Sequence, residues 1–137
     1  MEGSTVEYAE LVDRALVVSV NQTFPRRSLY DAARFAWLVS PARVAGLDYV
    51  IATKNREIVG VFVPAEWKRA TRDNFPEFDM DLPTRLGFIG ADAPREIRDR
   101  YVGKHLPPDF EFAGTGMRYC EPRSAGARRE AGGAPTS

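Results

Sequence analysis

The sequence predicts a single α+β domain in which a mixed sheet carries one main helix. Hydrophobic residues make up 44% of the 137 residues and aromatic residues 11%, which fits one folded core rather than a disordered chain. Short β-rich runs alternate with helix-like segments along the chain. Proline, glycine and asparagine stand between these runs, where turns are expected.

The first elements are a strand and a helix. The run RALVVSV at 14–20 is short and β-branched, which favours a buried strand. Ser28 stands at the N-cap position before LYDAARFAWLV, so a helix is expected over 29–39. The step Ser40-Pro41 ends that helix, because a residue before proline resists helical dihedrals, and a further turn is expected over 41–44.

The clearest signal in the chain is a hairpin. Two apolar, β-rich runs at 48–53 and 57–63 flank a polar break that contains Asn55. Pro64 is expected to close the second of these strands, and residues 65–71 can then make one or two helical turns.

The second half of the chain predicts a loop, a strand and a helix. The stretch DNFPEFDMDLP at 73–83 is rich in proline and acid, which is typical of a long loop. TRLGFIG at 84–90 indicates a strand, and Pro94 can open a short helix at its favoured first position. A last strand is expected near 117–120.

The element order is therefore β, α, β, β, turn, β, α, β. It describes a mixed sheet with one main helix packed on it, compatible with a strongly curled sheet or a partly open barrel of the PUA-like kind. Large apolar residues are absent from Pro122 onward, so we expect a globular domain over 1–121 and a disordered tail over 122–137.

Charge and residue counts exclude several classes of protein. Nineteen basic and nineteen acidic side chains cancel, so the chain lacks the global positive charge typical of nucleic-acid binding, and any such argument must be local. Cys120 and His105 are the only residues of their types, which excludes an internal disulfide and a Cys/His zinc site and favours a reducing cytoplasm. No apolar run approaches the roughly 20 residues that cross a bilayer, so we expect no membrane partner.

The most suggestive pattern lies in the predicted first helix. Tyr30, Arg34 and Trp37 fall at i, i+4 and i+7, so a helix would place the guanidinium between two aromatic side chains. Arg26 and Arg27 lie in the preceding loop, and the group resembles a grip for a phosphate whose base stacks on a ring. The alternative is that the aromatic residues cover the edge of the core while Arg34 pairs with a carboxylate.

A second aromatic residue is interleaved with bases. Trp67 is followed by Lys68 and Arg69, and a tryptophan in such a place serves either as a core edge or as a ligand platform. Lys104 is a further candidate for a phosphate contact.

The acidic loop offers a different chemistry. Glu77, Asp79 and Asp81 alternate along the chain, and alternating carboxylates can converge on a divalent cation. A solvated loop is the commoner outcome for such a segment.

Four motifs give the chain a family likeness over about residues 28–104. They are a YxxxRxxW helix that begins at Tyr30, the segment GVFVxxxW that ends at Trp67, an FxG strand at 88–90 and YVGK at 101–104. Together they resemble a family of small, largely uncharacterised bacterial proteins. The resemblance implies a self-contained domain and carries no activity with it.

Three functions remain open from the sequence. The leading hypothesis is a non-enzymatic binding module for nucleic acid or a nucleotide, with no cofactor, no metal and no catalytic residue. Its ligand-binding residues would be Tyr30, Arg34, Trp37, Arg26, Arg27, Trp67 and Lys104. The second is a protein-interaction or assembly domain that uses the same aromatic stripe. The third is a small hydrolase or nuclease with a metal at the acidic loop.

Overall fold

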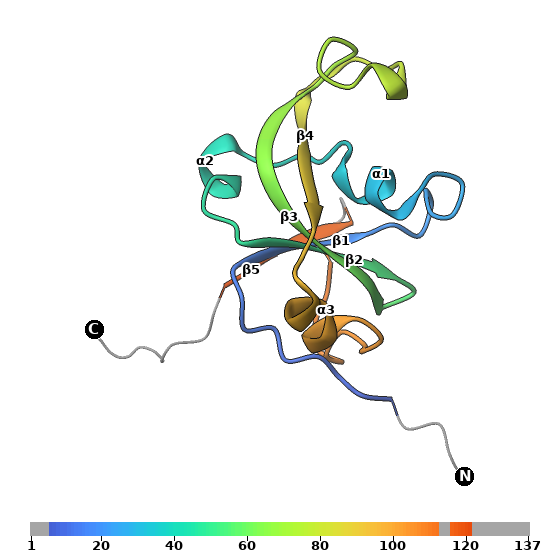
Figure 1. The fold of residues 1–137 in the computed structure, drawn as a ribbon, viewed down its shortest axis with the longest axis vertical. Helices are drawn as coiled ribbons and strands as arrows, with labels where there is room; N and C mark the ends of the chain where they lie inside the picture. Colours follow the sequence, from blue (N-terminus) through green and yellow to red (C-terminus); the bar gives the residue numbers. More distant parts are fainter. Residues whose placement is uncertain (1–5, 113–115, 122–137) are drawn as a thin grey trace, which may run out of the picture.

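The fold is a five-stranded mixed sheet with short helices on both faces (Figure 1). The computed structural model describes residues 6–112 and 116–121, so the tail predicted at 122–137 lies outside the described residues. The strands are β1 (Ala15–Ser19), β2 (Tyr49–Lys54), β3 (Glu57–Ala70), β4 (Leu82–Asp92) and β5 (Met117–Cys120). Their spatial order is β4-β3-β2-β1-β5, with β1 and β2 parallel and the other neighbours antiparallel.

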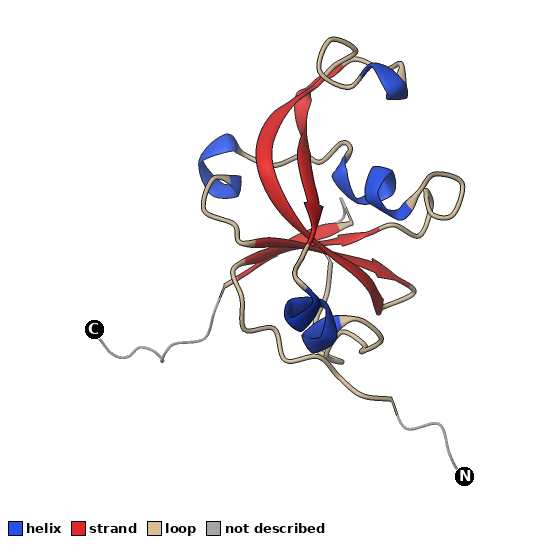
Figure 2. Ribbon diagram, in the orientation of Figure 1, coloured by secondary structure: helices blue, strands red, loops and turns tan. Residues whose placement is uncertain are grey.

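The helices are short and divide between the two faces of the sheet (Figure 2). They are α1 (Leu29–Arg34), α2 (Pro41–Val44) and α3 (Arg95–Tyr101), together with the 3₁₀ turn η1 (Pro76–Phe78). The outer halves of β3 and β4 form a long arm that rises between α1 and α2, and α3 lies on the other side of the sheet. No helix among the described residues is long and apolar enough to span a membrane.

Side-chain alternation along β1 explains why its first four residues, 15–18, are all apolar. Leu16 and Val18 point to one face, where they meet Ala32 and Ala33 of α1 in one core cluster. Val17 points to the opposite face and packs in the cluster that contains α3. A strand segment that is covered on both sides favours apolar residues at successive positions, so residues 15–18 do not alternate between apolar and polar.

Much of the predicted element order is confirmed. The strand at 14–20, the turn over 41–44, the hairpin and the strand near 117–120 all form, as β1, α2, β2–β3 and β5. Asn55 and Arg56 make the two-residue hairpin turn with left-handed φ angles of 51° and 71°. Pro94 acts as the N-cap of α3 rather than as its first helical residue.

The fold class is confirmed as α+β with a mixed sheet, but the barrel is not. The sheet has two edge strands, β4 and β5, and is therefore open. The expected strong curl and the PUA-like comparison consequently find no support in the arrangement of the strands.

The prediction of a helix over 29–39 is wrong in its second half. α1 ends at Arg34, and the Phe35–Ala36 peptide is cis. Trp37 then exchanges two backbone hydrogen bonds with Leu86 on the free edge of β4, at 2.8 and 2.9 Å. Pairing with a distant strand thus overrides the local helical pattern.

The predicted end of the second hairpin strand at Pro64 is also wrong. β3 runs on to Ala70, so residues 65–71 form no helical turn. Pairing with β2 ends at Phe62, and the ladder with β4 has an irregularity between Pro64 and Glu66. A proline is tolerated there because it sits beside a bulge, on a stretch that has a strand partner on one side only.

Candidate functional site

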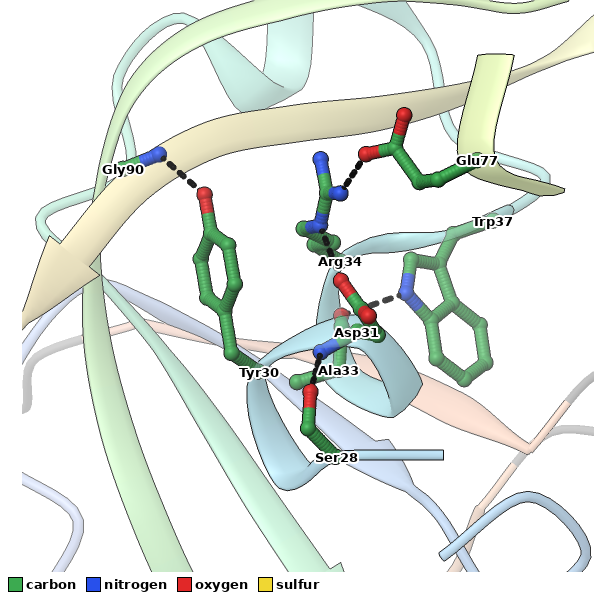
Figure 3. Close-up of polar contacts among 8 residues, drawn as sticks. All are labelled: Ser28, Tyr30, Asp31, Ala33, Arg34, Trp37, Glu77 and Gly90. Atoms are coloured by element: carbon green, nitrogen blue, oxygen red, sulfur yellow. Dashed lines mark hydrogen bonds and ion pairs between the residues drawn. The ribbon is translucent and has the colours of Figure 1, made fainter. Parts of the chain in front are cut away.

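Arg34 lies in a buried ion-pair cluster at the end of α1 (Figure 3). Its side chain is 8% exposed. Its Nε donates to Asp31 Oδ1 at 2.8 Å, and its Nη2 donates to the carboxylate of Glu77 on η1. Two carboxylates from separate elements therefore neutralise the positive charge of Arg34, which the sequence predicted would bind a phosphate.

Aromatic rings surround the same guanidinium. The Cζ atom of Arg34 lies 4.8 Å from the ring centroid of Tyr30, 5.3 Å from Phe75 and 5.1 Å from Phe78. Of the two rings expected beside this arginine, Tyr30 is in place and Trp37 is not, and the other two rings come from the loop between β3 and β4. The cluster consequently holds that loop against α1.

The ionisation of this pair follows from its surroundings. Desolvation lowers the pKa of Arg34, but hydrogen bonds to Asp31 and Glu77 outweigh it and leave the pKa raised. The pKa of Glu77 is lowered, first by a backbone hydrogen bond of Glu77 itself and then by Arg34. Both groups are therefore charged near neutral pH, as a structural ion pair requires.

Tyr30 and Trp37 also have structural partners. The hydroxyl of Tyr30 accepts a hydrogen bond from the backbone N–H of Gly90 at 2.9 Å, and its ring packs against Phe62 and Phe88. The indole N–H of Trp37 donates to the carbonyl of Ala33 at 2.8 Å (Figure 3). Since Trp37 lies beyond the end of α1, these residues do not form the predicted helical stripe.

The remaining basic candidates do not converge on one place. Arg27 stacks on Phe78, with its Cζ atom 4.4 Å from the ring centroid. Arg26 is exposed and donates to the carbonyl of Gln22 at 2.7 Å. Lys104 follows α3 on the other face of the sheet, where its Nζ lies 3.6 Å from Glu7.

The acidic loop is paired with arginines. Arg72 donates to Asp79 at 2.9 Å and to Asp81 at 3.2 Å, while Glu77 binds Arg34. Across residues 6–112 and 116–121, no group of three His, Cys, Asp or Glu residues could hold a metal ion.

A groove of about 520 Å³ lies between α2 and the outer half of β3. It exists because β3 continues beyond its pairing with β2, which leaves one edge of the strand facing α2. Its lining residues are Pro41, Val44, Ala45 and Leu47 from the α2 segment, 64–69 from β3, and Leu86 from β4. The groove therefore combines an apolar wall with a charged strand edge.

Trp67 is the aromatic residue of this groove. It is partly exposed, and its ring packs on Phe88 with 5.2 Å between centroids. Its indole N–H has no hydrogen-bond acceptor among the residues that the structure describes. Lys68 Nζ lies 3.9 Å from Glu66, beyond hydrogen-bond distance, and Arg69 Nη1 donates to the carbonyl of Pro83.

Arg43 is a residue that the sequence interpretation did not single out. Its guanidinium lies 3.7 Å from the ring centroid of Tyr119 on β5. The residue is exposed, and within the described part of the chain its side chain makes no ion pair or hydrogen bond. No local signal could have found this pair, because Arg43 and Tyr119 are far apart in the sequence.

The chain matches no protein-family model, no curated protein and no solved structure. The family likeness seen in the motifs over 28–104 stays a prediction. A function for this protein must accordingly be argued from the geometry of its own residues.

Proposed function

We propose that this protein is a non-enzymatic binding module for nucleic acid or a nucleotide, and that its site is the groove between α2 and β3. The observation that carries the proposal is Trp67, a partly exposed indole whose N–H has no acceptor among the described residues, beside Lys68 and Arg69 in an open groove. The α1 cluster has no part in it, because the charge of Arg34 is already taken by two carboxylates.

The groove offers the two kinds of contact that a nucleotide needs. A base can stack on the indole of Trp67, against the apolar wall of Val44 and Leu47. Lys68 and Arg69 bring two positive charges to the wall of the groove against the single acid Glu66, although the guanidinium of Arg69 also donates to the carbonyl of Pro83. Lys68 forms an ion pair with Glu66 at 3.9 Å without a hydrogen bond, so a phosphate would compete there with one loosely held carboxylate.

The test is a fluorescence titration with short single-stranded and duplex oligonucleotides at two salt concentrations. Binding should quench the emission of Trp67 and weaken as salt rises, because phosphate contacts release counterions. In Trp67→Phe the remaining emission comes from Trp37, and the quenching should disappear. Trp67→Ala should weaken binding by the ~1–3 kcal/mol of one stacked base, about 5- to 150-fold.

A matched control removes one charge elsewhere. Arg95 on α3 is highly exposed on the other side of the sheet, and Arg95→Gln should bind as the parent protein does. Quenching that persists in Trp67→Phe would mean that the ligand lies beside Trp37 and not in this groove.

One observation favours a protein ligand as the second candidate. Beyond Phe62 the edge of β3 that faces α2 has no strand partner within residues 6–112 and 116–121, so backbone N–H and C=O groups of this stretch face the groove. An extended peptide could add to this edge as a strand. A salt-insensitive, flat oligonucleotide titration would favour this candidate over the first.

A further inference from the structure

We propose that the groove binds single-stranded nucleic acid several nucleotides long rather than a free mononucleotide, with Arg43 on Tyr119 as a second phosphate anchor. This inference rests on the proposed function of the Trp67 groove and gives its ligand a length. The inference follows from the position of α2, which lies between the Trp67 groove and the Arg43–Tyr119 pair.

α2 presents different residues to its two sides. Pro41 and Val44 line the groove at Trp67, whereas Arg43 lines a separate surface depression with Tyr119. Successive residues of a helix point about 100° apart, so Arg43 and Val44 cannot face the same side of this single turn. A ligand that reaches both Trp67 and Arg43 must therefore pass over α2.

The guanidinium of Arg43 is held in a position from which it can bind an anion. Its guanidinium is held on the ring of Tyr119 at 3.7 Å, and its five N–H donors have no acceptor among the described residues. A stacked guanidinium loses less rotamer freedom on binding than a free one, and its fork matches two phosphate oxygens. Glu111 lines the same depression, but no carboxylate of the described chain lies within ion-pair distance of Arg43.

Trp67 and Tyr119 stand on the same face of the sheet. Both pack against the core cluster that contains Leu16, Val18 and Phe88. A strand of nucleic acid laid across α2 could consequently contact both aromatic residues without crossing the edge of the sheet. Arg118, which also lines the depression, is engaged with the carbonyl of Glu111 and the ring of Phe110.

The hydroxyl of Tyr119 supplies an internal control. It is buried and has no hydrogen-bond partner among the described residues, so only the ring is needed to support Arg43. Tyr119→Phe keeps that ring, and it should bind oligonucleotides as the parent protein does. Tyr119→Ala removes the support of Arg43 and should weaken binding of long ligands.

The experiment is a length series measured by fluorescence anisotropy and Trp67 quenching. The probes are thymidine monophosphate and oligothymidylates up to about eight nucleotides, within the ~4–16 that small single-strand-binding domains occupy. Affinity should rise with length in the parent protein. Arg43→Gln should bind the longer probes about tenfold more weakly, the loss of one charge-assisted contact, and should leave the mononucleotide unaffected.

Salt dependence gives a second readout for the same variant. Loss of one phosphate contact should reduce the slope of log K against log salt by about 0.7 for a single strand. Arg43→Lys keeps the charge but loses the planar fork, so its slope should be retained while its affinity falls. Arg95→Gln should change neither quantity.

The outcomes separate this inference from the proposed function. Equal affinity for the mononucleotide and the longer probes, or an unaffected Arg43→Gln, would overturn the second anchor and leave the Trp67 site standing. Equal losses for all lengths would also overturn it, since Arg43 would then belong to the same subsite. Tighter binding of duplex than of single strand would overturn the single-strand ligand, and no binding of any probe would remove the proposed function itself.

Discussion

Arg34 and Arg43 are two arginines on short neighbouring helices, each packed on an aromatic ring, yet their surroundings differ completely. Arg34 is buried, pairs with Asp31 and Glu77, and lies among three rings. Arg43 is exposed, lies on Tyr119 alone, and has no acid partner in the described chain.

The difference teaches that an arginine beside aromatic rings is not in itself a binding site. Two carboxylates neutralise Arg34, so a phosphate there would have to displace both and would leave them unpaired. Arg43 offers the same planar cation without that competition. The N–H donors of a guanidinium that have no acceptor, rather than the rings beside it, decide whether it can bind a ligand.

The largest expected effect is on stability, at Arg34. Arg34→Ala leaves Asp31 and Glu77 without their cation and should lower the free energy of unfolding by about 3 kcal/mol. This is the lower end of the range for breaking a buried pair, because the carboxylate of Glu77 is 44% exposed. Urea denaturation measures the change.

A graded variant strengthens that test. Arg34→Lys keeps the charge but reaches only one of the two acids well, so its loss should be smaller than that of Arg34→Ala. Stability equal to that of the parent protein in both variants would show that Arg34 does not hold the loop.

The next effect is a pH dependence of stability that comes from the buried Tyr101. Arg100 donates to Asp13 at 2.8 Å, and the same Asp13 oxygen accepts the hydroxyl of the buried Tyr101 at 2.6 Å. Burial, and then the carboxylate of Asp13, raise the pKa of Tyr101 to about 12. Tyr101 is fully buried, so the folded state favours its protonated form.

The sign of the pH effect follows from that shift. A pKa raised on folding gives stability that is fully present below pH 10, and this stability is lost as the pH rises toward about 12. The loss from this group should be roughly 1.4 kcal/mol per pH unit across that window. In Tyr101→Phe this component should be missing, as alkaline urea titrations of both proteins would show; parallel curves would contradict the raised pKa.

The smallest expected effect returns to Arg43. Arg43→Ala removes an exposed cation–π contact and no ion pair, so stability should fall by less than about 1 kcal/mol. Urea denaturation of this variant beside Arg34→Ala compares the two arginines directly. A loss of stability as large as that of Arg34→Ala would show that Arg43 has a structural role like that of Arg34, and it would remove Arg43 as a phosphate anchor.

Local patterns in the sequence determined most of the elements. The β-branched run at 14–20, the hairpin around Asn55 and the Ser28 cap each depend on neighbouring residues, and each forms as expected. Trp67 beside Lys68 and Arg69 was also visible, because an aromatic residue among bases needs no distant partner to be recognised.

Only the tertiary structure decided what the arginines do. The sequence left open whether Arg34 binds a phosphate or a carboxylate, and Glu77 settles its partner from 43 positions away. The predicted helical stripe does not form because Trp37 pairs with Leu86 in an extended conformation. The groove exists because β3 continues beyond its pairing with β2. Contacts of this kind join segments far apart in the chain, so the energy that fixes them is absent from any local pattern.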